Sequence, residues 1–189
     1  MKKTLTIVLI AAAGALGIAG AAAVFAPSMF AREESRAAQP VWSEINWPFL
    51  TDQWGRGKAF ACKAADCGTD IKLYLRAKIG FCNCTTGVAD DDEVERLADF
   101  DLFGNRQTAL APGQPVDVHW MKGRSRPYAF TSPDWRGKSF LTIAFNDKCD
   151  AIVATAVVDR AQPAALESAI LAFLNTERVL RWAQATLGL

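Results

Sequence analysis

Four of the five cysteines lie close together, in the segment FACKAADCGTDIKLYLRAKIGFCNC (residues 60–84). Such a group could bind a metal, exchange disulfides or form structural cross-links. Zinc sites usually space their cysteine pairs by two to four residues, twice over. Here four residues separate Cys62 from Cys67 and one separates Cys82 from Cys84, so the spacing favours zinc poorly. Two thiolates can hold copper(I) nearly linearly, which leaves a copper or zinc site at these cysteines as an alternative.

Disulfide cross-links are the preferred interpretation of this group. Neither pair has the Cys-x-x-Cys form of a redox motif at the start of a helix. Cys62 and Cys67 bracket a predicted turn, so a bond between them would close its base; the other option links both across to Cys82 and Cys84. The number of cysteines is odd, and we expect Cys149, at the start of a predicted strand, to be the free thiol.

A catalytic role is weakly indicated. His119 and Asp117 alternate on a predicted strand, so the carboxylate could orient the imidazole beside Ser139 or Cys149 as a nucleophile. No G-x-S-x-G, S-x-x-K or H-E-x-x-H motif accompanies them. We therefore expect a solvent-facing pair and a protein that is not an enzyme, with no cofactor outside the copper or zinc alternative.

Tryptophan and arginine residues outline a candidate binding surface. Three tryptophans fall within residues 42–54, and the segment WGRGKAF (54–60) is similar to WRGKSF (135–140). Both segments precede predicted strands. The rings either pack over a sheet edge or form a shelf for a ligand. The residues of this surface are Trp42, Trp47, Trp54, Arg56, Trp135 and Arg136.

The N-terminal residues predict export. Lys2 and Lys3 precede an uncharged run over residues 4–26, which is either a cleaved signal peptide or a retained membrane anchor. Residues 27–41 are small, charged and proline-containing, as is typical of a flexible tether. We expect residues 42–189 to form a single domain in the periplasm or another extracytoplasmic space. If the run is retained, residues 4–26 contact the inner membrane.

Charge excludes one class of partner. The formal net charge of the chain is +1, and its 21 basic and 20 acidic residues are interspersed. Lys122, Arg124 and Arg126 fall in a predicted loop that could meet an anionic partner, but nothing resembles the basic surface of a nucleic-acid-binding protein. We expect the partner to be an envelope protein or a small ligand, and no nucleic acid.

Hydrophobic patterning predicts an α+β domain. Strict alternation over residues 71–81 is typical of a half-buried strand. Further strands are predicted over residues 58–62, 116–121, 139–145 and 149–158, with a tight loop at 146–148. A helix is predicted near 92–103, and two more follow Pro163 and Asn175 or Thr176. The expected fold is a mostly antiparallel sheet of about five strands, with a helix insert and two C-terminal helices packed on one face.

Together these features predict an exported, disulfide-stabilised envelope protein of a non-enzymatic binding or accessory type. The alternative is a thiol-based metal-handling or redox accessory protein that uses Cys62, Cys67, Cys82 and Cys84.

Overall fold

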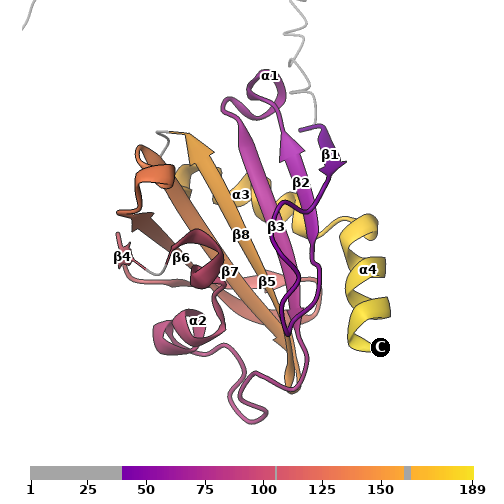
Figure 1. The fold of residues 1–189 in the computed structure, drawn as a ribbon. Helices are drawn as coiled ribbons and strands as arrows, with labels where there is room; N and C mark the ends of the chain where they lie inside the picture. Colours follow the sequence, from indigo (N-terminus) through magenta and orange to yellow (C-terminus); the bar gives the residue numbers. More distant parts are fainter. Residues whose placement is uncertain (1–39, 105, 160–162) are drawn as a thin grey trace, which may run out of the picture. The chain divides into compact units, whose positions relative to one another are not determined.

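The computed structural model of the protein describes residues 40–104, 106–159 and 163–189. The predicted export segment 4–26 and nearly all of the predicted tether lie outside these ranges. Within the described residues, eight strands form one sheet in which every paired neighbour is antiparallel (Figure 1). No helix in these ranges is both long enough and apolar enough to cross a bilayer.

The sheet has the order β1-β2-β3-β8-β7-β6-β4, and β5 also pairs with β6. The strands are β1 (Trp42–Ile45), β2 (Lys58–Cys62), β3 (Ile71–Lys78), β4 (Gln107–Ala109), β5 (Gln114–Val118), β6 (Met121–Phe130), β7 (Lys138–Asp147) and β8 (Asp150–Asp159). The helices are α1 (Ala64–Cys67), α2 (Asp91–Leu97), α3 (Pro163–Leu174) and α4 (Glu177–Leu187), with short 3-10 helices η1 (Phe100–Phe103) and η2 (Pro133–Trp135).

One face of the sheet carries the aliphatic core. Ile71, Leu73 and Leu75 of β3 are fully buried and belong to the same apolar cluster as Ile170 of α3 and Val179 of α4. Figure 1 shows α3 behind the sheet, as expected for a helix that covers this face. The prediction of two C-terminal helices on one face agrees with this packing.

The opposite face is also covered, by aromatic rings and by α2. Phe103 of η1 packs against Phe49, Trp135 and Phe140 with ring centroids 5.2–5.3 Å apart. The predicted single helix over 92–103 is broken at Ala98 and Asp99, so that α2 and η1 cover adjacent parts of the sheet. Both faces of the central strands are therefore buried.

The α+β class and the antiparallel sheet are confirmed, but five strands is too few. The strands β1, β4 and β6 were missing from the prediction. The buried face of β6 includes Gly123 and Ser125, which give almost no hydrophobic signal. Lys122, Arg124 and Arg126 alternate with these residues, so the predicted cationic loop is a strand in the structure.

The β7–β8 hairpin positions the cysteines described below. Asp147 pairs with Asp150, which leaves Lys148 and Cys149 as a two-residue loop. Lys148 has φ +53°, in the left-handed region that a non-glycine residue rarely adopts. The predicted hairpin is confirmed, and its loop lies one residue further along the chain than expected.

Candidate functional site

The first disulfide joins Cys62 to Cys67. Cys62 ends β2 and Cys67 ends α1, so the bond closes the turn between β2 and β3. Of the two arrangements that the sequence left open, the structure has the local one. A bond between residues five apart restrains only the turn that contains it, which fits a structural cross-link.

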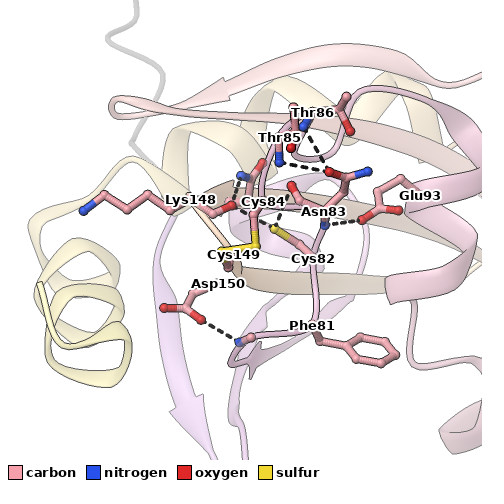
Figure 2. The surroundings of a disulfide bond; sticks show 12 residues. Phe81, Cys82, Asn83, Cys84, Thr85, Thr86, Glu93, Lys148, Cys149 and Asp150 are labelled. Atoms are coloured by element: carbon pink, nitrogen blue, oxygen red, sulfur yellow. Dashed lines mark hydrogen bonds between the residues drawn. A yellow bond between two sulfur atoms is a disulfide. The ribbon is translucent and has the colours of Figure 1, made fainter.

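The second disulfide joins Cys84 to Cys149, 65 residues apart in sequence. The expectation that Cys149 is the free thiol is therefore wrong. Cys149 lies in the β7–β8 loop rather than inside a strand, and the segment after β3 passes directly beside that loop (Figure 2). The bond thus fastens this segment to the central hairpin.

The free cysteine is Cys82, which is buried and 6% exposed. Its backbone N–H donates to the carbonyl of Cys149 at 3.1 Å, and its thiol donates to the carbonyl of Lys148 at 3.1 Å. Burial raises the pKa of the Cys82 thiol, and the negative charge of Glu93 adds to the increase. At neutral pH the group is a protonated, packed thiol next to a disulfide.

Polar contacts hold the segment around this disulfide. Asn83 Oδ1 accepts from the N–H groups of Thr85 and Thr86, and its own N–H donates to Glu93 Oε1 at 3.0 Å (Figure 2). Asn146 Oδ1 accepts from the N–H of Val88. Three sulfur-bearing residues therefore lie in a segment with a defined conformation.

The four clustered cysteines do not form one site. Cys62 and Cys67 lie at the beginning of β3, whereas Cys82 and Cys84 lie beyond its other end. An eight-residue strand is roughly 25 Å long at about 3.3 Å per residue. Three of the four sulfurs are in disulfides, and no group of three or more potential ligands arranged for a metal occurs among the described residues.

Trp42 lines an open groove between β1 and the two C-terminal helices. Its ring stacks on Phe173 of α3, with centroids 4.5 Å apart and planes inclined by 20°. The groove has a volume of about 470 Å³, which is in the range of pockets for small molecules. Its lining is mostly apolar, with a hydroxyl and a guanidinium at one end: Pro40, Trp42, Ala169, Ala172, Phe173, Thr176 and Arg178.

The polar end of this groove carries an excess of positive charge. Glu44 of β1 accepts from Lys58 Nζ at 2.6 Å and from Arg178 Nη2 at 3.1 Å, so one carboxylate faces two cations. The hydrogen bond from Lys58, with the nearby Arg178, holds the pKa of Glu44 below its ordinary value. The three side chains together keep one net positive charge.

The other predicted surface residues do not join Trp42. Trp47 and Trp135 pack in the aromatic cluster on the opposite face of the sheet. Trp54 lies over the Lys78 ammonium, 4.6 Å from the ring centroid. Arg56 and Arg136 lie at the starts of β2 and β7 respectively, in the segments that lead into them. The role of these side chains as a joint binding surface stays a prediction.

A buried charge network was missed by sequence reasoning. Alternation predicted that Arg76 and Lys78 face solvent, but they are 1% and 4% exposed. Asp99 Oδ1 accepts from Arg76 Nη2 at 2.6 Å and from Lys78 Nζ at 2.7 Å, and Asp52 also pairs with Arg76. Although burial alone lowers the pKa of Arg76, the carboxylates of Asp99 and Asp52 outweigh it and raise that pKa. The network joins the 46–56 segment and η1 to the sheet.

His119 lies in the β5–β6 hairpin loop with φ +54°, rather than on a strand. Its backbone N–H donates to Asn175 Oδ1 at 2.7 Å. Asp117 pairs with Lys122 Nζ at 2.7 Å across the hairpin. The role of these two residues in catalysis has no support from the contacts of either side chain in the described chain.

The basic residues of β6 are also paired. Arg124 contacts Asp91 at 2.7 Å, and Arg126 contacts Glu95 at 2.6 Å; both acidic residues belong to α2. These ion pairs attach α2 to the sheet, so the side chains expected to meet an anionic partner are largely neutralised.

In comparisons with known proteins, no protein-family model matches the chain, and no curated sequence is significantly similar to it.

Proposed function

We propose that the chain is an exported, extracytoplasmic binding protein that holds a small anionic amphipathic ligand, without catalysis, in the groove beside Trp42. The apolar part of the ligand would lie against Trp42 and Phe173. Its anionic group would lie at the end of the groove where Arg178 and Thr176 are found.

The two disulfides support the extracytoplasmic location. Structural disulfides form and persist in oxidising compartments and are rare in the cytosol. Four of the five cysteines are bonded, and the predicted export segment over residues 4–26 agrees with that environment.

The observation that carries the proposal is the groove itself. Aromatic and small apolar side chains line most of it, and its polar groups are few and grouped at one end. This is the usual composition of a small-molecule site, in which apolar area supplies affinity and a few polar groups fix orientation. The guanidinium of Arg178 also lies over the ring of Phe60, 5.2 Å from its centroid, which limits its movement.

The sign of the ligand charge follows from the ions at that end. Because Glu44 is shared between Lys58 and Arg178, it neutralises only one of the two cations. An incoming carboxylate, sulfonate or phosphate monoanion would balance the charge that remains. A cationic ligand would be repelled.

Two fluorescent probes test the proposal. Anilinonaphthalene sulfonate has aromatic rings and one negative charge, and phenylnaphthylamine has similar rings and no charge. We expect the sulfonate to bind saturably and more tightly than the neutral probe. Arg178→Gln should weaken the sulfonate about fivefold, since a half-exposed ion pair contributes about 1 kcal/mol, and should leave the neutral probe unchanged.

Arg181→Gln is the matched control, because Arg181 is an exposed arginine of the same helix outside the groove. Far-UV circular dichroism of each variant checks that the fold is kept. Equal affinities of the two probes, or equal loss in both arginine variants, would contradict an anion-binding groove.

A further inference from the structure

Cys149 has two cysteine neighbours on the facing segment. It is bonded to Cys84, and its carbonyl accepts the backbone N–H of Cys82 at 3.1 Å. Cys82 and Cys84 are separated only by Asn83. Figure 2 shows the Cys82 sulfur beside the bonded pair.

The backbone contact between Cys82 and Cys149 brings them as close as paired residues of neighbouring strands. Disulfides in proteins require Cα atoms about 4.4–6.8 Å apart, which is the spacing of such neighbours. The Cys82 thiol already reaches across to this loop, since it donates to the carbonyl of Lys148 at 3.1 Å.

We propose that Cys82 and Cys84 exchange as the disulfide partner of Cys149 by intramolecular thiol–disulfide exchange. The Cys82 thiolate attacks Cys149 Sγ, the bond between Cys82 and Cys149 forms, and the bond between Cys84 and Cys149 breaks. The electron pair of the broken bond leaves on Cys84 Sγ, which takes up a proton equivalent to the one that Cys82 lost. No oxidant or reductant is consumed.

The exchange moves the free thiol from a buried position to an exposed one. Cys82 is buried, whereas Cys84 is exposed. In the resting arrangement the thiol is therefore protected, and after exchange it can meet a thiol-reactive partner. The three residues act as a site that presents Cys84 Sγ as a nucleophile only in the exchanged state.

The charged groups around Cys82 set how readily the thiolate forms. Glu93 of α2 and Asp150 of β8 disfavour it, and Arg96 of α2 favours it. Since the thiolate is the attacking species, exchange should accelerate as the pH rises. The resting pair is thus kept at neutral pH by burial and by the two carboxylates.

The first experiment uses single substitutions in the full chain. Each variant is purified without reductant, denatured in acid, then alkylated and weighed by intact mass spectrometry. In Cys84→Ala we expect Cys82 to bond to Cys149, which leaves no alkylated cysteine. Alkylation of both Cys82 and Cys149 in this variant would overturn the proposal. The control, Cys82→Ala, keeps the Cys84–Cys149 bond and should also show no alkylation.

The second experiment uses the unmodified protein, so it does not depend on a variant folding. The native protein is incubated with an alkylating reagent at about pH 8.5, near the ordinary pKa of a cysteine, and the modified residue is located by peptide fragmentation. We expect the adduct on Cys84, with Cys82 bonded to Cys149. An adduct on Cys82 with Cys84 still bonded, or no adduct on either residue while denatured protein is alkylated, would overturn the proposal.

Discussion

Loss of the Cys84–Cys149 disulfide should destabilise the domain about twice as much as loss of the Cys62–Cys67 disulfide. The first bond joins residues 65 apart in sequence and the second joins residues five apart. Because a cross-link acts mainly by restricting the unfolded chain, its effect grows with the logarithm of the loop length. The expected losses in the free energy of unfolding are about 4 kcal/mol and about 2 kcal/mol.

Two variants separate these contributions. Cys84→Ala with Cys149→Ala removes the long-range bond and gives Cys82 no partner in the loop. Cys67→Ala opens the short loop and leaves the buried Cys62 sulfur in its packing position. Urea unfolding without reductant, followed by tryptophan fluorescence and far-UV circular dichroism, gives the free energy and the slope m for each.

The slope provides an independent reading. Removal of a cross-link lets the unfolded chain expand and expose more surface, so m should rise, and more so for the longer loop. A loss from Cys67→Ala that equals or exceeds that of the double variant would refute the loop-length reasoning. Cys82→Ala keeps both bonds and serves as the control for loss of a sulfur atom.

Two further predictions concern charged side chains. Asp99→Asn should lower the free energy of unfolding by about 3–5 kcal/mol, since it leaves Arg76 and Lys78 buried with too little negative charge; Asp101→Asn, at an exposed acid of the same 3-10 helix, should change it by less than about 0.5 kcal/mol, and equal effects in urea unfolding would contradict the buried network. The N–H of Gly113, with Arg124, holds the pKa of Asp91 below its ordinary value, so this carboxylate stabilises the fold above the unfolded pKa near 4 and the contribution is lost as the pH falls through the lower folded pKa. Asp91→Asn should therefore be less stable than the wild type at neutral pH and lose less stability on acidification; parallel pH profiles would contradict the role of Asp91.

Local patterns predicted the elements whose partners lie nearby in sequence. The β7–β8 hairpin consists of two apolar runs joined by a short polar loop, and its pairing needs no distant information. The helices α3 and α4 follow from an apolar stripe and from Pro163 and Thr176 at their starts. For these segments, periodicity and end residues suffice.

Distant partners account for what the sequence did not predict. Arg76 and Lys78 look like solvent-facing residues of an alternating strand, and their burial depends on Asp99, more than twenty residues away. The pairing of Cys84 with Cys149 depends on the position of the β7–β8 loop beside the segment after β3. Neither relationship leaves a pattern in a single sequence.

The groove beside Trp42 is of the same kind. Trp42 was singled out as one of several aromatic residues, but the side chains that make the groove with it come from α3 and the start of α4, about 130 residues later. Arg178 itself had no distinguishing feature in the sequence. Its significance comes from the shared Glu44 and from the stacked rings next to it.

The most direct test of an exported, disulfide-stabilised domain is the mass of the protein recovered from the cells that naturally make it. The sample is denatured in acid, alkylated without reductant and weighed intact. Two disulfides predict one alkylated cysteine per chain among the five. Alkylation of all five would contradict the account, because the thiols would then be kept reduced, as in the cytosol.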